Sequence, residues 1–199
     1  MGQRLVVSVE HFGQCLAKIY FHWSAYTVSA LYETQKIVGC IYDHNDETEK
    51  QLQLRLIRFC EENGGGIRGD DAEFEYIQNM YPNLDFKKDG YSRNCGLIAL
   101  SESGMEDLQS WSEGDVTINI DEDLINFGVC GWYESFEEYN EERKEWDDEF
   151  DGLTLEEIPD IGCDLGYINV GELYNVVAAL DSVNSHVVRH GSEIFELIE

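Results

Sequence analysis

The negative charge of this chain lies almost entirely in its second half. The 199 residues carry a formal net charge of −28. Residues 1–93 contain 14 Asp and Glu against 10 Lys and Arg, whereas residues 94–199 contain 27 against 3. A net charge of about 2–8 is enough to keep a small domain in solution, and a larger charge of one sign repels itself and opposes compaction. The excess therefore predicts a surface suited to a strongly positive partner.

A packed core is nevertheless expected. Hydrophobic residues make up 43% of the chain and aromatic residues 12%, whereas a disordered chain of high charge is poor in both. A chain of this length buries roughly 70% of its extended surface. We expect one composite domain over residues 1–199. A subdivision near residue 90, into a near-neutral part (1–90) and a strongly acidic part (91–199), remains an alternative.

Alternating hydrophobic residues at the start of the chain predict a β-hairpin, and helical spacing predicts helices after it. Ser24 and Asp46 are the expected N-caps of the first two helices. The elements expected in this half are strands at 4–10 and 15–21, helices at 25–42, 47–62 and 71–81, and a loop at 84–93.

The second half is expected to add a further hairpin and more helices. Asn169 and Glu172 have the spacing of a capping box at the start of one helix. The elements expected here are strands at 95–100, 116–120, 124–133 and 187–198, helices at 103–111, 135–150 and from 169 to 183, and a loop at 152–166. Strands joined by short turns favour an α+β fold, with antiparallel hairpins and helices packed on one face.

Residues 134–151 have the pattern of an acidic amphipathic helix. One face is a stripe at steps of three and four, formed by Phe136, Tyr139, Arg143, Trp146 and Phe150. Ten acids lie off that stripe against Arg143 and Lys144, a net charge of −8. Eighteen helical residues span about 27 Å, so the net charge is one per about 3.4 Å, as along one DNA strand.

Acidic side chains are therefore the candidate partner-binding residues. They are Glu134, Glu137, Glu138, Glu141, Glu142, Glu145, Asp147, Asp148, Glu149 and Asp151 of that segment, with Asp121, Glu122 and Asp123 of the preceding turn. The alternatives are a solvated helix face and a general adaptation to high salt. The second would spread charge over the whole surface, and the difference between the halves argues against it.

No pattern in the chain indicates catalysis or a specific cofactor. Asp147 begins a run like a calcium loop, but the twelfth position is Ile158, where a bidentate Glu is needed. The glycine-rich run 64–69 lacks the Lys-Ser/Thr of a phosphate loop. We expect no enzymatic activity, metal or cofactor. Direct nucleic-acid binding is not expected without a basic stripe, nor membrane insertion without an apolar run of about 18–20 residues.

Acid-rich folded proteins of this kind resemble the nucleic-acid mimics of bacteriophages, which include antirestriction and anti-CRISPR proteins. The resemblance rests on residues 102–164, with 22 acids against Arg143 and Lys144. The N-terminal segment 3–26 also looks like small phage proteins of no assigned activity. The resemblance implies an inhibitor in the host cytoplasm that blocks the basic nucleic-acid channel of a defence enzyme, with a CRISPR-Cas nuclease as the first candidate.

A second hypothesis comes from a different class of function. Tyr20, His22, Trp23 and Tyr26 could form an aromatic pocket for a small molecule or nucleotide. The acidic half would then serve only to keep the protein in solution. The sequence does not indicate the oligomeric state.

Overall fold

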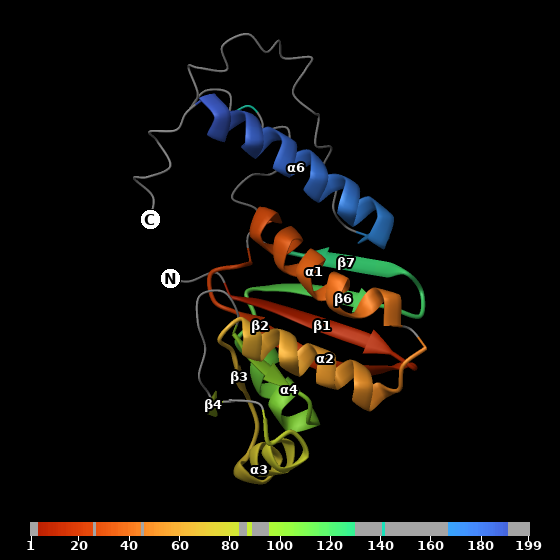
Figure 1. Cartoon of the computed structure of the whole chain (residues 1–199), viewed down its shortest axis with the longest axis vertical. Coiled ribbons are helices and arrows are strands. Elements are labelled where there is room, and N and C mark those ends of the chain that lie inside the picture. The colour runs from red at the N-terminus through yellow and green to blue at the C-terminus, as the bar shows by residue number, and fades with distance from the viewer. Residues whose placement is uncertain are drawn as a thin grey trace.

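An eight-stranded mixed sheet organises the fold, in the order β4-β3-β5-β2-β1-β6-β7-β8 (Figure 1). The structure is a computed structural model, and it describes residues 4–25, 27–44, 46–83, 87–88, 96–129, 141 and 167–190. Strands and helices along this part of the chain confirm the expected α+β class. The acidic helix expected at 135–150 lies outside the described residues, apart from Glu141, as does the loop expected at 152–166.

The predicted N-terminal hairpin forms the middle of the sheet. β1 (Leu5–His11) and β2 (Gln14–Phe21) pair antiparallel. Phe12 and Gly13 join them with φ of +56° and +69°, as a two-residue type I′ turn requires. Successive side chains of a strand point to opposite faces. The interior residues of β1 therefore divide between two cores, one on each face of the sheet.

Three further strands extend the sheet on the β1 side. β6 (Gly114–Asn119) pairs with β1 in parallel and with β7 (Leu124–Gly128) as the predicted hairpin. β8 (Tyr167–Ile168) then pairs antiparallel with β7 and forms the edge. The strands of the two hairpins therefore meet in one continuous sheet.

On the β2 side the sheet ends in three short strands. They are β5 (Leu97–Ala99), β3 (Gly66–Ile67) and β4 (Lys87–Lys88). β5 pairs antiparallel with β2, whereas β3 pairs in parallel with both β5 and β4. β3 and β4 were not expected, and β4 falls in the predicted loop at 84–93. A strand of two residues is too short to show the alternation of hydrophobic and polar residues from which strands are predicted.

Helices cover both faces of the sheet. α1 (Thr27–Ile41), α2 (Glu49–Glu62) and α6 (Val170–His190) share the main core with one face, and Figure 1 shows α1 and α2 lying over the strands, roughly in line with them. α4 (Glu102–Gln109) lies on the opposite face, where Leu108 packs with Val6 and Tyr20. This second, smaller layer was not expected. α3 (Asp71–Met80) and the short η1 (Tyr42–His44) complete the described helices.

The helix starts test the predicted caps. Asn169 accepts from the Glu172 N–H at 2.9 Å, and the Glu172 carboxylate accepts from the Asn169 N–H at 2.8 Å, which confirms the capping box of α6. The two other predictions were wrong. α2 begins after Thr48 rather than at Asp46, and buried Ser24 lies three residues before α1. A polar residue near a helix start is a weaker signal than a reciprocal pair.

The last described helix also corrects a prediction. α6 runs to His190, so the strand expected at 187–198 is wrong for 187–190, and the remainder lies outside the described residues. Leu180, Val183 and Val187 continue the hydrophobic residues of α6 at steps of three and four, which is a helical spacing. The valines at 187 and 188 also suit a strand, and for that reason a strand was predicted there. Among the described helices, none is both long and apolar enough to cross a bilayer.

Candidate functional site

The strand register divides the sheet into two ends. Leu5 pairs with both Phe21 and Gly114, and Gly128 pairs with Asp115, so these residues lie at the same end. We call it the root end, because the chain leaves the sheet there after Val129; it returns at Tyr167, which pairs with Asn126 in the middle of β7. The root end comprises Trp23, Ala25, Gly114 and Val129. The opposite end, which we call the turn end, comprises Phe12, Gly13, Asp121, Glu122 and Asp123.

The most acidic stretch of the chain begins at the root end. Residues 130–166 hold fourteen Asp and Glu against Arg143 and Lys144, a net charge of −12. They connect β7 to β8, two neighbouring strands in which Asn126 pairs with Tyr167. Ten of the thirteen predicted partner-binding acids belong to this segment, and the one that the structure describes, Glu141, is exposed. The acidic segment is thus attached on both sides to hydrogen-bonded strands.

Close packing fixes the point from which the acidic segment leaves. A Cβ added at Gly114 would lie 2.9 Å from the Ala25 Cβ and 3.4 Å from the Val129 Cα. Glycine is therefore needed for the segment after β2 to approach the end of β7. Beside it, the backbone N–H and guanidinium of Arg4 donate to the Glu113 carboxylate at 3.0 and 3.1 Å. This pairing holds the beginnings of β1 and β6 together.

At the turn end, Asp121 is engaged within the fold. One carboxylate oxygen lies 2.5 Å from Nδ1 of the buried His11, and the other accepts from the Gly13 N–H at 3.2 Å. The Gly13 N–H and the His11 imidazole hold the pKa of Asp121 below its usual range. Asp121 thereby joins the β6–β7 turn to the β1–β2 turn.

Asp123 also makes a hydrogen bond within the fold, although Asp121, Glu122 and Asp123 are all exposed to solvent. The Asp123 carboxylate accepts from the Val170 N–H at 3.3 Å, at the start of α6, and it raises the pKa of Tyr42. Glu122 has an exposed side chain, and its N–H donates to Asn119 Oδ1 at 3.1 Å. The acids of this turn lie at the far end of β6 and β7 from the root of the acidic segment.

The aromatic residues of the second hypothesis come together in part. The Tyr20 hydroxyl lies 2.7 Å from His22 Nδ1, and the Trp23 ring meets the His22 ring edge-on, with centroids 5.1 Å apart. Tyr20 is buried and Trp23 is 49% exposed. Tyr26 lies outside the described residues. The cluster is therefore packed at Tyr20 and open at Trp23.

Two residues that the sequence did not indicate extend this cluster. Trp111 meets Tyr20 edge-on with ring centroids 5.6 Å apart, and the Arg68 guanidinium lies 4.9 Å above the Trp111 ring. Arg68 also pairs with Asp107 at 2.6 Å. No spacing in the sequence connects these residues with 20–26, because only the packing of the sheet against α4 brings them together.

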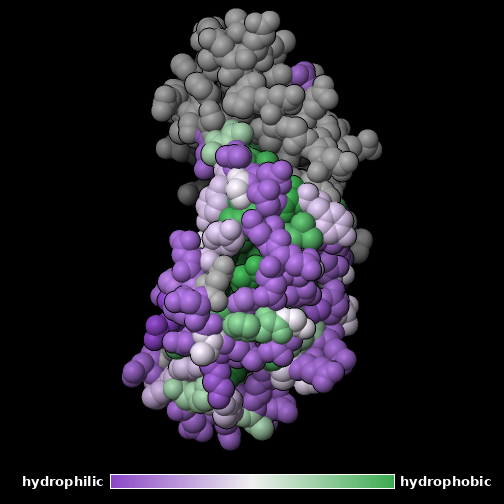
Figure 2. All heavy atoms as spheres, turned by 90° about the vertical axis from the view of Figure 1, so that its right-hand side faces the viewer, coloured by the Kyte–Doolittle hydropathy of each residue, from purple (hydrophilic) through white to green (hydrophobic). Residues whose placement is uncertain are grey.

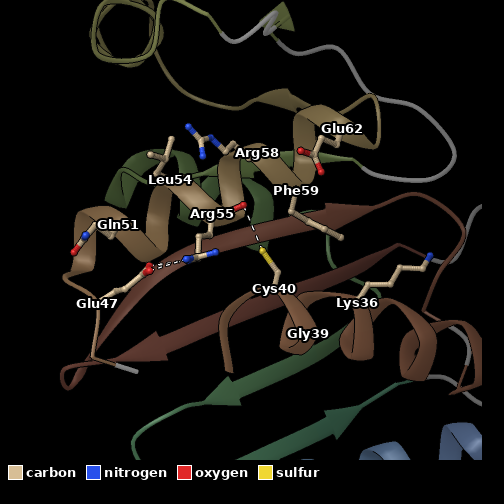
Figure 3. A pocket seen from close by; sticks show the side chains of 10 residues that line it. All are labelled: Lys36, Gly39, Cys40, Glu47, Gln51, Leu54, Arg55, Arg58, Phe59 and Glu62. Carbon is tan, nitrogen blue, oxygen red and sulfur yellow. Dashed lines mark hydrogen bonds and ion pairs between the residues drawn. The ribbon is translucent and has the colours of Figure 1, made fainter. Parts of the chain in front are cut away.

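A surface cavity of about 560 Å³ lies between α1 and α2 (Figure 3). Its lining residues are Lys36, Gly39, Cys40, Glu47, Gln51, Leu54, Arg55, Arg58, Phe59 and Glu62. The Arg55 guanidinium donates two hydrogen bonds to the Glu47 carboxylate, at 2.6 and 2.7 Å. Burial raises the pKa of the Cys40 thiol, which disfavours the nucleophilic thiolate. The volume suits a small molecule, but the described lining offers no activated nucleophile.

The rest of the described surface offers few further candidates for a binding site. No group of three or more His, Cys, Asp or Glu side chains placed to hold a metal occurs in this part of the chain. Figure 2 shows a mostly hydrophilic surface with small hydrophobic patches on the side that it presents. The large exposed hydrophobic residues are Phe12, Trp23, Tyr76, Met80, Tyr167 and Tyr174. One of them, Trp23, belongs to the root end.

Comparison with known proteins gives no relative. No family model matches the chain, and neither the curated proteins nor the solved structures contain a match. The charge and geometry of this chain are therefore the observations that bear on its function.

Proposed function

We propose that the chain inhibits a host nucleic-acid-binding defence enzyme, with a CRISPR-Cas nuclease as the first candidate. Its acidic segment, residues 130–166, occupies the basic channel in which that enzyme holds nucleic acid. The observation that carries the proposal is the insertion of a segment of net charge −12 between the paired strands β7 and β8. The resemblance to phage-encoded nucleic-acid mimics supports the same function.

The physical basis is competition for lysine and arginine side chains. Binding of nucleic acid derives much of its affinity from phosphates neutralised by basic residues, and RNA-guided nucleases hold the heteroduplex in a positively charged channel. As the expected helix, residues 134–151 would carry charge at the density of a phosphate strand and would compete for that channel. Opposite charges also make association fast and sensitive to salt.

The test compares two variants with the same change in net charge. E138K/E142K/D148K alters the acidic segment, and E62K/E75K/E106K alters exposed acids of α2, α3 and α4. DNA cleavage by a panel of purified RNA-guided and restriction nucleases is measured with and without each protein. We expect inhibition of at least one nuclease, weakened on the order of 100-fold by the segment variant because several close charge pairs become repulsive, and nearly unchanged in the control.

Three results would overturn the proposal. They are a panel in which no nuclease is inhibited, a segment variant that inhibits as well as the wild type, and a control variant that loses as much as the segment variant. The last result would show that total charge matters and the position of the charge does not.

A second candidate function is the binding of a small molecule or nucleotide, favoured by the ring contacts of Tyr20, His22 and Trp23. Mass spectrometry of the purified protein tests it. The wild type would carry a co-purifying ligand that Trp23→Ala loses, and a ligand-free wild type would argue against this function.

A further inference from the structure

Trp23 combines an unfavourable backbone conformation with an exposed ring. Its φ is +70°, in the left-handed region that large side chains avoid. Yet the side chain is 49% exposed and meets the edge of one neighbouring ring, that of His22. Burial of the indole therefore does not explain why a tryptophan stands here. Residues held in such conformations occur preferentially at functional sites.

The position of Trp23 connects it with the acidic segment. Ala25, two residues later, and Val129, from which the acidic segment departs, both lie against Gly114. Trp23 follows the end of β2, and Phe21 of β2 pairs with Leu5 at the root end. The exposed indole therefore stands at the end of the sheet from which a segment with net charge −12 departs.

We propose that Trp23 is a contact residue of the inhibitory interface, with its indole face against an arginine or lysine side chain that borders the partner's basic channel. This inference rests on the proposed function. A cation over an indole face is attracted by the ring quadrupole, and tryptophan is enriched among the few residues that dominate interface affinity. Within the molecule, Arg68 already occupies the face of Trp111 at 4.9 Å.

Charge complementarity selects this occupant over a nucleotide. A nucleobase could also stack on an exposed indole, but its phosphates would approach the root of the acidic segment and be repelled. A basic channel carries the opposite charge and is attracted by the same segment. The two occupants can be distinguished experimentally, because one is a cation and the other an anion.

The first experiment needs no knowledge of the target enzyme. The indole N–H signal of Trp23, assigned by its loss in Trp23→Phe, is followed by NMR while the full chain is titrated with nona-arginine or with adenosine monophosphate. We expect nona-arginine to shift the Trp23 signal more than that of Trp111, whose face Arg68 covers, and the nucleotide to shift neither. A Trp23 signal that does not shift with nona-arginine, or that shifts with the nucleotide, would overturn the inference.

The second experiment measures affinity for a nuclease that the protein inhibits. Trp23→Ala is expected to raise Kd about tenfold or more, with Trp23→Phe retaining part of the affinity. The matched control is Phe12→Ala, which removes an equally exposed aromatic of positive φ at the turn end and should leave Kd unchanged. Circular dichroism establishes that each variant is folded.

The outcomes separate the two proposals. If Trp23→Ala binds like the wild type while the acidic-segment variant does not, the inference is wrong and the proposed function stands. If the acidic-segment variant binds like the wild type, the proposed function fails. If no nuclease responds, the peptide titration still decides whether Trp23 receives a cation.

Discussion

The two ends of the sheet use similar residues in opposite ways. Each has a chain reversal with an exposed aromatic at positive φ, Phe12 at the turn end and Trp23 at the root end. At the turn end, the carboxylates of Asp121 and Asp123 accept hydrogen bonds from other elements of the fold. At the root end, the acidic segment leaves the sheet after Val129, beside Gly114. Acidic residues therefore hold the fold together at one end, and we propose that they bind a partner at the other.

The largest effect on stability is expected from an added methyl group at the root end. Gly114→Ala places a Cβ 2.9 Å from the Ala25 Cβ, so the neighbours must move, and such overpacking costs about 1–3 kcal/mol. Gly128→Ala, on the neighbouring strand β7, meets its nearest atom at 3.6 Å and should be nearly neutral. Urea unfolding of both variants measures the difference. Equal stabilities would show that the root end is not closely packed.

An intermediate effect is expected where the two aromatics have positive φ. Asparagine tolerates this conformation, so Phe12→Asn and Trp23→Asn should each raise the free energy of unfolding by about 0.5–1 kcal/mol. Loss of the Phe12 ring, stacked on His11 at 3.8 Å, reduces the gain at the turn end. Thermal unfolding and nuclease binding are measured together. Only Trp23→Asn should lose affinity, and a parallel loss in Phe12→Asn would erase the distinction between the ends.

The smallest effect concerns the pH dependence of the turn end. The pKa of Asp121 is lowered below its ordinary value of 3.8 in the folded protein. Its contribution to stability is therefore present above about pH 4 and is lost as pH falls through the folded pKa. Asp121→Asn removes this titration, so its Tm should fall less steeply than that of the wild type between about pH 4 and pH 2.

A matched control is the exposed neighbour in the same turn, Glu122→Gln, which should keep the wild-type slope. Glu47 and Glu113, whose pKa values are lowered by Arg55 and Arg4, remain in every variant and contribute equally. Identical slopes for Asp121→Asn and the wild type would mean that the contacts of Asp121 with Gly13 and His11 do not stabilise the fold.

Periodicity predicted the long elements of the fold and failed at the short ones. The β1–β2 and β6–β7 hairpins and helices α1 to α4 follow from alternation and helical spacing. Alternation assigns side chains to faces but does not specify a partner strand, so the parallel pairing of β1 with β6 could not be predicted. The residues of α6 beyond 186 were mistaken for a strand, because a Val-rich run suits both structures.

At the candidate site too, the sequence pattern located a segment but did not reveal its contacts. Composition alone located the acidic segment, but it could not show that Asp121 and Asp123 are already engaged. Their partners His11 and Val170 lie 110 and 47 residues away in the chain. Nothing in the sequence indicates the positive φ of Trp23 either, since tryptophan is not a residue that favours it. Contacts distant in sequence and backbone conformation become visible only in the folded chain.

Hydrogen–deuterium exchange of the chain, alone and bound to a nuclease that it inhibits, tests the difference between the two ends most directly. The account predicts slower exchange on binding in peptides that cover residues 22–25 and Val129 of the root end and residues 130–166 of the acidic segment. It predicts unchanged exchange in peptides that cover residues 11–14 and 120–124, at the turn end. Protection confined to the turn end, or to the α1–α2 cavity, would contradict it.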